Sequence, residues 1–170
     1  MKEYSAPWSP SLIAVSTLAT LVCLGLAVGL LAAGPGRSQW LGLLPLLILL
    51  ACALFSIRGY SLTASTLRVH RPFWTTQVSL ANLSSARFEP SAMRWSLRLW
   101  GNGGLFSITG FFFNRPLGRY RAWVTDPHRT VVLRFPTRTL LISPSEPEEF
   151  INHLRSLLPM AHESAATSTA

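Results

Sequence analysis

The stretch "TLLISPSEPEEFINHLRSLLP", residues 139–159, contains a change of periodicity that decides how the second half of the chain folds. Residues 139–143 form a short β-branched and aliphatic run, which is typical of a strand. After it, apolar side chains recur every three or four positions, which is typical of one face of a helix. These side chains are Phe150, Ile151, Leu154, Leu157 and Leu158. The stretch therefore predicts a strand that leads into an amphipathic helix.

The two ends of this helix have their own signals. We expect Ser145 to be the N-cap and Pro147 to lie in the first turn, where a missing N–H costs least. The two glutamates that follow complement the positive end of the helix dipole. Pro159 predicts the end of the helix, and the small, polar residues 160–170 predict a disordered tail.

Upstream of the helix, short runs separated by turn residues predict about seven strands. Some runs alternate, so that Leu67 and Val69 face one side of a sheet and Arg68 and His70 the other. The runs are residues 60–65, 66–71, 75–80, 84–89, 119–125, 130–135 and 139–143. Many antiparallel strands followed by one helix predict a small barrel or sandwich, residues 58–159, with the helix closing one end.

The first third of the chain differs because it has almost no charge. Between Glu3 and Arg58 the only charged residue is Arg37. Residues 12–33 form an apolar run long enough to cross a hydrocarbon core about 30 Å thick, and residues 40–57 are marginally long enough. Neither run has the polar face of a soluble helix, so both predict transmembrane helices.

Six residues, 34–39, separate the two runs and predict a tight turn, because glycine and proline interrupt a helix and the polar side chains need water. Positive charge lies before the first run and after the second. The positive-inside rule therefore places the N-terminal segment 1–11 and the residues from 58 onward in the cytoplasm. The sequence predicts a multi-pass protein of the cell (plasma) membrane with both termini cytoplasmic. The alternative for the first run is a cleaved signal peptide with Lys2 as its basic start, but the run exceeds the usual length.

Small residues line one face of the first apolar run. Gly25, Gly29 and Ala33 are four positions apart, and such a line lets two helix backbones approach closely. It predicts transmembrane packing, either on the second helix of the same chain or on a second copy. Cys23 and Cys52 lie inside the apolar runs and read as thiols rather than a disulfide or a metal pair. No ionisable side chain lies inside either run, which argues against a proton relay or a transport path.

The glycine-rich stretch "GNGGLFSITGFFFNRPLGRY", residues 101–120, invites comparison with phosphate-binding loops. No lysine follows a glycine, as a P-loop requires, and Phe106 stands where a dinucleotide fingerprint needs its last glycine. We therefore expect these glycines to serve turns and kinks between strands. The histidines are scattered and Asp126 is the only aspartate. This composition predicts no enzyme, no metal site and no cofactor.

Arginine dominates the charge of the region after residue 57. That region has 13 arginines and 6 acidic residues, a difference of +7. Arginine and tryptophan together suit an anionic membrane surface, while the alternative is an ordinary solvated face. The candidate membrane or ligand contacts are Arg68, Arg71, Arg94, Trp95, Arg98, Trp100, Arg115 and Arg119. Nucleic-acid binding would suit the charge, but no RNA motif is present.

Four strings in the expected order carry a family resemblance. They are "YSLTASTLRVHR", "GNGGLFSITGFFF", "GRYRAWVTDPHRTVVLRF" and "LLISPSEPEEFINHL", which together cover most of residues 58–158. The chain resembles the bacterial pleckstrin-homology-like (PH) domain family, in the branch preceded by two transmembrane helices. The resemblance implies two near-orthogonal antiparallel sheets capped by a C-terminal helix, and a binding module without catalytic residues. Eukaryotic relatives of the fold can bind phosphoinositides in a basic pocket, but no such motif maps onto this chain, in which Lys2 is the only lysine.

The sequence thus predicts a membrane-anchored α+β protein: a two-helix transmembrane hairpin followed by a PH-like antiparallel sandwich with a C-terminal helix. Its expected function is a non-catalytic binding module at the anionic leaflet surface. The alternative is a protein–protein assembly module, in which a strand edge or a helix groove takes a peptide of a membrane partner or of a second copy. A transporter subunit ranks third, because the apolar runs contain no ionisable group.

Overall fold

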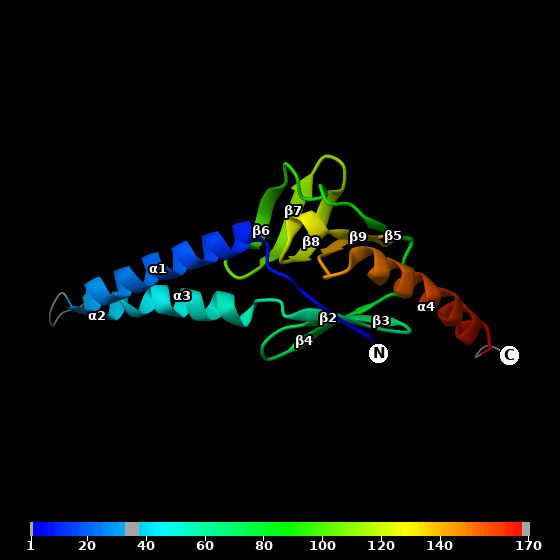
Figure 1. Ribbon diagram of the computed structural model, residues 1–170, viewed down its shortest axis with the longest axis horizontal. Helices are drawn as coiled ribbons and strands as arrows, with labels where there is room; N and C mark the ends of the chain where they lie inside the picture. Colours follow the sequence, from blue (N-terminus) through cyan, green and yellow to red (C-terminus); the bar gives the residue numbers. More distant parts are fainter. Residues whose placement is uncertain (1, 33–37, 168–170) are drawn as a thin grey trace.

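The computed structural model describes residues 2–32 and 38–167 (Figure 1). The helices are α1 (Pro10–Ala32), α2 (Ser38–Leu41), α3 (Leu43–Leu54) and α4 (Pro147–Thr167). The strands are β1 (Lys2–Ser5), β2 (Gly59–Thr63), β3 (Thr66–His70), β4 (Thr75–Ser79), β5 (Ser85–Phe88), β6 (Leu97–Gly103), β7 (Ile108–Asn114), β8 (Gly118–Val124), β9 (Val131–Arg134) and β10 (Thr139–Ile142), with a single 3-10 turn, η1 (Pro127–Arg129), before β9. In Figure 1, α1 and α3 lie side by side and project from one end of the β domain, and α4 lies at the other end.

Two sheets make up the β domain. One has the strand order β1-β2-β3-β4 and the other β5-β9-β10-β8-β7-β6. All seven strands expected from the sequence are present in the expected order. Three more, β1, β6 and β7, were not expected, so the prediction of about seven strands was too low.

The expectation of purely antiparallel sheets was wrong at one pair. β10 runs parallel to β8, with Leu140 opposite Arg121. The chain reverses at η1 to form β9 and again to form β10, so β10 regains the direction of β8 and fills the space between β8 and β9. The other strand pairs are antiparallel, as expected.

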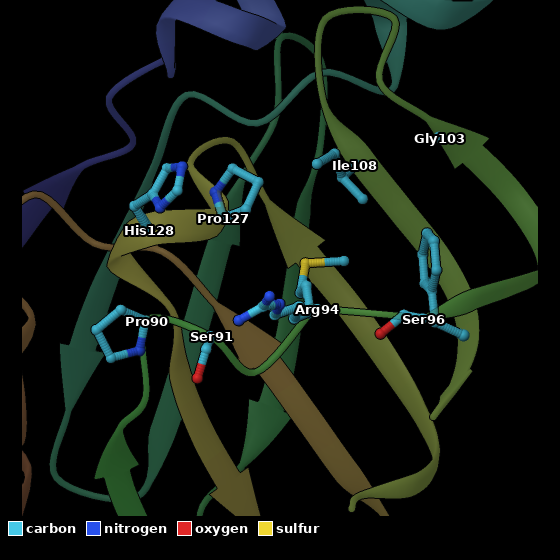
Figure 2. Close-up of a pocket in the computed structure, with 10 residues that line it drawn as sticks. Pro90, Ser91, Arg94, Ser96, Gly103, Ile108, Pro127 and His128 are labelled. Atoms are coloured by element: carbon cyan, nitrogen blue, oxygen red, sulfur yellow. The ribbon is translucent and has the colours of Figure 1, made fainter. Parts of the chain in front are cut away.

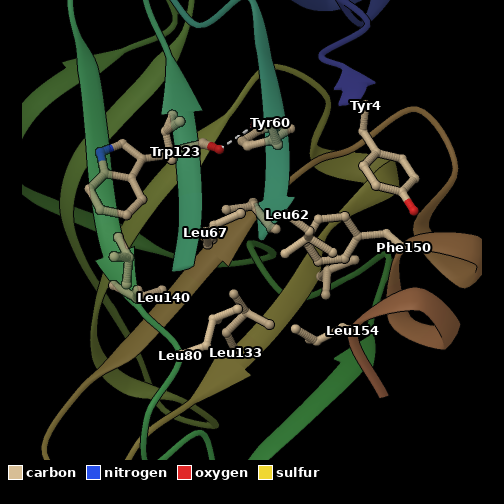
Figure 3. Packing of buried hydrophobic residues seen from close by; sticks show 14 of the residues in the cluster. Tyr4, Tyr60, Leu62, Leu67, Leu80, Trp123, Leu133, Leu140, Phe150 and Leu154 are labelled. Atoms are coloured by element: carbon tan, nitrogen blue, oxygen red, sulfur yellow. Dashed lines mark hydrogen bonds between the residues drawn. The ribbon is translucent and has the colours of Figure 1, made fainter. Parts of the chain in front are cut away.

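The main core lies between the two sheets and is closed by α4 (Figure 3). Leu62 and Leu67 of the first sheet face Leu133 and Leu140 of the second, and Phe150 of α4 is fully buried at their edge. This core also contains one satisfied polar group. The hydroxyl of Tyr60 donates to the backbone oxygen of Trp123 at 2.7 Å and accepts from the backbone N–H of Ser143 at 3.2 Å. The sandwich closed by a C-terminal helix is therefore confirmed.

The N-terminal segment is a strand of the domain rather than a separate segment. β1 pairs with β2 from Lys2 opposite Leu62 to Ser5 opposite Gly59. Tyr4 is buried, packs edge-on against Phe150 with ring centroids 5.1 Å apart, and contacts His153 through its hydroxyl at 3.0 Å. Lys2 also forms an ion pair with Glu149 at the start of α4. Residues 2–5 thus complete the sheet from before α1.

Of the two expected spans, one matches its prediction closely. α1 is the one helix in the described ranges that is long and apolar enough to cross a membrane. The second run divides into α2 and α3 at Gly42, because Pro45 has no N–H to donate to the carbonyl one turn earlier. Gly42 keeps helical backbone angles, φ −64° and ψ −22°, so α2 continues closely into α3. The expected turn 34–39 lies mostly outside the described residues.

The small-residue line does not form the contact between the two helices. Gly25 and Gly29 are exposed, and a Cβ built on either would have no atom within 4 Å. Ala27 is the buried residue in this part of α1. The interpretation that this face packs on the chain's own second helix is therefore wrong for both glycines, and Ala33 lies outside the described residues. Cys23 and Cys52 are free and half-buried.

The boundaries of α4 differ from their sequence signals at both ends. The helix begins at Pro147, so Glu146 precedes it, and the N–H of Phe150 donates to the carbonyl of Glu146 at 2.9 Å. Ser145 was therefore placed one position too early as the N-cap. The helix continues through Pro159 to Thr167, so the prediction of an end at Pro159 was wrong.

The glycine-rich stretch forms the β6–β7 hairpin. Gly101 lies opposite Gly110, both with positive φ, and a Cβ on Gly110 would lie 2.1 Å from the carbonyl oxygen of Trp100. The turn of this hairpin docks on α1: the N–H of Phe106 donates to the Ser16 hydroxyl at 2.9 Å. The glycines therefore serve strand geometry, as expected, and the turn fixes the β domain against α1.

Candidate functional site

The structure separates the eight candidate contact residues onto different parts of the domain. Arg68 lies on β3 on the face opposite Leu67 and Val69, which point into the core. Trp95 and Arg115 lie at the end of the β6–β7 hairpin opposite its glycine-rich turn, because Leu97 pairs with Phe113 there. Arg98 folds back on its own hairpin, so that a Cβ on Gly103 would lie 2.5 Å from its guanidinium. The candidate residues therefore do not form the single basic face that the sequence suggested.

Arg94 lines a cavity of ≈ 640 Å³ (Figure 2). The walls include Ser91, Ser96, Ile108 and His128, and Arg94 lies at the centre in Figure 2. The Ser96 hydroxyl already accepts hydrogen bonds from Asn114 and Tyr120, so it holds the loop rather than a ligand. Among the residues that the structure describes, no acidic side chain lines this cavity. It is open and has a single permanent charge, which gives it little power to select a ligand.

A more strongly charged site lies where α3 meets the second sheet. Residues Ala51, Cys52, Phe55, Arg71, Trp100 and Arg121 line a cavity of ≈ 420 Å³, which we call the junction pocket. Arg71 follows β3, and its Nη1 donates to the carbonyl of Phe55 at 3.0 Å, just past the end of α3. Arg121 projects from the middle of β8. Residues 50 positions apart are thus brought to one pocket.

A second cavity of ≈ 350 Å³ adjoins the junction pocket and shares Arg121 with it. Arg119 and Arg138 also line this second cavity. Arg119 and Arg121 are two positions apart on β8, so they point to the same side as Trp123, which belongs to the core between the sheets. We call the row formed by Arg71, Arg119, Arg121 and Arg138 the arginine groove.

Aromatic rings hold the guanidinium groups of this groove. Arg71 lies 5.7 Å from the centroid of Phe55 and 5.6 Å from that of Trp74. Arg121 lies 5.5 Å from the centroid of Phe111 and 4.6 Å from that of Trp123. Such contacts attract the cation and fix its plane. The two arginines are therefore pre-oriented before any ligand arrives.

The positive charge of the groove is not neutralised by the described part of the chain. Neither Arg71 nor Arg121 has an ion-pair partner there, and no acidic residue lines either cavity. The Nε of Arg71 is buried without a hydrogen-bond acceptor. Burial and then the charge of Arg121 lower the pKa of Arg71, and burial and then the charge of Arg138 lower the pKa of Arg121. An anion would relieve this repulsion.

Sequence reasoning included Arg71, Trp100 and Arg119 among the candidates and missed Arg121 and Arg138 as partners. Arg119, Arg121 and Trp123 alternate along one strand, and this signal could have placed Arg121 on the inner face of the sheet. No sequence signal places Arg138 beside Arg121, because that contact depends on the parallel pairing of β10 with β8. Within the described residues there is also no cluster of side chains suited to a metal ion.

Comparison with known proteins agrees with this architecture. A family profile described as "Bacterial PH domain" matches residues 58–158, which include β2 to β10 and the first half of α4. No curated protein and no solved structure matches the chain significantly. The matched part covers more than half of the chain, and it contains both sheets except β1, the first half of the closing helix and the arginine groove. The chain therefore belongs to the bacterial PH domain family.

Proposed function

We propose that this protein is a membrane-anchored, non-catalytic binding module whose PH domain lies on the anionic leaflet surface. The observation that carries the proposal is the way the helices join the domain. α1 leaves the sheet directly after β1, and α3 returns to it directly before β2, the strand that pairs with β1. A helix pair that leaves and re-enters one sheet at neighbouring strands suits a hairpin that crosses a membrane and comes back.

The surface of the two helices supports the same proposal. Long aliphatic side chains are exposed along both, for example Leu18, Leu21 and Val28 on α1 and Leu44 and Leu47 on α3. Exposed apolar surface of this extent is unfavourable in water, whereas the hydrocarbon core of a bilayer is a favourable environment for it. α2 and α3 together span residues 38–54, roughly 25 Å of helix, which is short for a bilayer without some thinning or tilt.

Aromatic side chains support a position for the membrane surface. Trp8 and Phe73 border a cavity with Leu50 and Leu54 at the domain-proximal end of the helices, and Trp40 lies exposed at the other end. Tryptophan is enriched at both interfaces of a bilayer. With this placement the arginine groove lies at the level of the headgroups, where each arginine gains about 1 kcal/mol from an anionic leaflet.

The topology can be tested by thiol labelling of the full chain in cells. In a background with Cys23→Ala and Cys52→Ala, single cysteines are introduced at Ser38, at the start of α2, and at Ser65, in the β2–β3 turn. An impermeant maleimide should label Ser38→Cys in intact cells and Ser65→Cys only after permeabilisation. Membrane fractions washed with alkaline carbonate should retain both variants. Release of the protein by that wash, or labelling of both sites in intact cells, would contradict the hairpin proposal.

A second candidate function is protein assembly through the edge of the second sheet. β6 pairs with β7 alone among the described strands, and its side chains Leu97 and Leu99 are 68% and 52% exposed. An exposed edge with apolar side chains can accept an added strand. A photoreactive residue at Leu99 should then crosslink a partner, whereas the same residue at Gln77 on β4, the other sheet's edge, should not. Equal crosslinking at both positions would argue against strand addition at β6.

A further inference from the structure

The junction pocket combines two features: arginines that have no ion-pair partner in the described part of the chain, and the apolar surface of a helix. Its charged wall is formed by Arg71 and Arg121, and its apolar wall by Ala51, Cys52 and Phe55 at the end of α3. The charged wall selects for a phosphate, because a guanidinium can donate two parallel hydrogen bonds to it. The apolar wall is unnecessary for a free phosphate ion.

The apolar wall continues along α3 away from the domain. Leu47 and Ile48 precede Ala51 and Cys52 by four positions each, so the four side chains form one stripe on the helix. Leu47 and Ile48 are exposed, and the stripe ends at Phe55, whose carbonyl orients Arg71. A ligand seated in the pocket would therefore have its anionic end at the arginines and could extend an apolar chain along the stripe. This is the shape of a phospholipid.

We propose that the junction pocket binds the phosphate of one anionic phospholipid, held by Arg71 and Arg121, with an acyl chain along α3. This inference rests on the proposed function, because the stripe meets lipid only if the helices lie in a membrane. It goes beyond general attraction to an anionic surface, since it assigns one lipid to one pocket. Arg119 and Arg138, in the adjoining cavity, are left to contact the remainder of the headgroup.

The pocket differs in kind from the rest of the basic surface. Arg87 and Arg155 are exposed and line none of the cavities described above. They provide a matched control, because replacing both removes the same charge as replacing Arg71 and Arg121. If lipid binds through general surface charge, its affinity depends only on how many arginines are replaced. If it binds in the pocket, its affinity depends on which arginines are replaced.

The test is lipid binding by the purified full chain in detergent, measured by native mass spectrometry with added phosphatidylglycerol or phosphatidylcholine. The wild-type chain should retain one phosphatidylglycerol in preference to phosphatidylcholine. Arg71→Gln and Arg121→Gln should each lower its affinity about tenfold, since a charge-assisted hydrogen bond is lost. Arg87→Gln with Arg155→Gln should leave it unchanged. An equal loss of affinity in the control pair, or no preference for phosphatidylglycerol in the wild type, would overturn the proposal of a lipid site in this pocket.

Two further arms separate the sources of the phosphate and the causes of failure. Inorganic phosphate at millimolar concentration should not displace the lipid; if it does, the site is one for free phosphate and the lipid assignment is wrong.

Cys52→Trp fills the pocket without changing its charge and should abolish lipid retention, whereas Cys23→Trp on α1 should not. All variants are first checked for carbonate-resistant membrane association and for an unchanged Tm. Loss of membrane association in the wild type would refute the proposed function, and loss of lipid selectivity alone would refute only the pocket.

Discussion

Gly110 shows at the scale of a single residue why the glycine-rich stretch contains glycine where it does. Its φ is +140°, and a Cβ there would lie 2.1 Å from the carbonyl oxygen of Trp100. Gly118 also has a positive φ, +67°, but a Cβ would meet nothing within 4 Å. Two glycines from one sequence motif are thus required for different reasons, one by backbone contact and one by backbone angle alone.

These two positions give a matched pair of substitutions. Gly110→Ala should destabilise the domain by about 3 kcal/mol or more, because strain and overlap with backbone act together. Gly118→Ala should cost only about 1 kcal/mol, the usual cost of a left-handed residue. Denaturant unfolding of the two variants in detergent measures the difference. Similar losses for both would mean that the cross-strand contact of Gly101 and Gly110 can relax.

The buried hydroxyl of Tyr60 makes the free energy of unfolding depend on pH in the alkaline range. Burial raises the pKa of its hydroxyl from 10.0 to about 12. The unfolded chain therefore loses this proton first, so the contribution of Tyr60 is complete below pH 10 and is lost as the pH rises through about 12. The full loss is about 3 kcal/mol, from two pKa units at 1.36 kcal/mol each. Tyr60→Phe should flatten this part of the profile, while an unchanged slope would assign it to other groups.

The same substitution has a cost at neutral pH. Phenylalanine leaves the carbonyl of Trp123 and the N–H of Ser143 without the hydroxyl that satisfies both. Unsatisfied buried groups of this kind cost about 1–3 kcal/mol. Tyr60→Phe should therefore lower the free energy of unfolding at pH 7, measured by denaturant titration. Tyr120→Phe removes a hydroxyl outside this core whose partner, Ser96, is half-buried, and it should cost less.

At the scale of elements, β1 determines which part of the chain can fold alone. The sequence suggested a domain at residues 58–159, but a piece that begins at residue 58 lacks Tyr4 and leaves β2 unpaired on one side. Joining Ala6 to Ile57 by a short linker would keep β1 and omit both helices, because Ser5 lies opposite Gly59. This linked form should unfold at a clearly higher Tm than residues 58–170. Equal Tm values would show that β1 adds nothing to the domain.

The elements that sequence reasoning found are those with a local signal. The seven expected strands and the start of α4 depend on periodicity and on turn residues, which act within a few positions. β1 was missed because "KEYS" carries little signal by itself, and it becomes a strand only through pairing with β2, more than 50 positions away. The arginine groove was found only in part for the same reason. Arg71, Arg121 and Arg138 meet through sheet topology and not through spacing.

The contact between the β6–β7 turn and α1 is a second element-scale feature with a measurable effect. Ser16→Ala removes the hydroxyl that accepts from the N–H of Phe106 and contacts the carbonyl of Gly104. Amide hydrogen exchange in residues 103–107 should then accelerate about tenfold, the equivalent of one net hydrogen bond. Ser11→Ala, at the exposed start of α1, is the control and should leave this exchange unchanged.

At the scale of the whole molecule, the proposed orientation of the domain on a bilayer distinguishes the candidate contacts near α3 from those at the far end of the β6–β7 hairpin. Phe73 lies with Leu50 and Leu54 at the end of α3, whereas Trp95 lies at the far end of the β6–β7 hairpin. In the cysteine-free background, a fluorophore on Phe73→Cys should be quenched by spin-labelled lipids, and one on Trp95→Cys should not. Strong quenching at both positions would mean that the "RWSLRLW" segment also lies on the lipid.

The pairing of β1 with β2 has a consequence for biogenesis. β1 leaves the ribosome before its partner β2, which is synthesised only after both apolar helices. If only one helix crossed the bilayer, β1 and β2 would lie on opposite sides of it, and Tyr4 could not reach Phe150. If the helices form the proposed hairpin, completion of the sheet thus reports that they were inserted as a pair. A chain inserted with the wrong topology would keep an open sheet edge and an uncovered core, the features by which quality-control proteases distinguish failed products from finished ones.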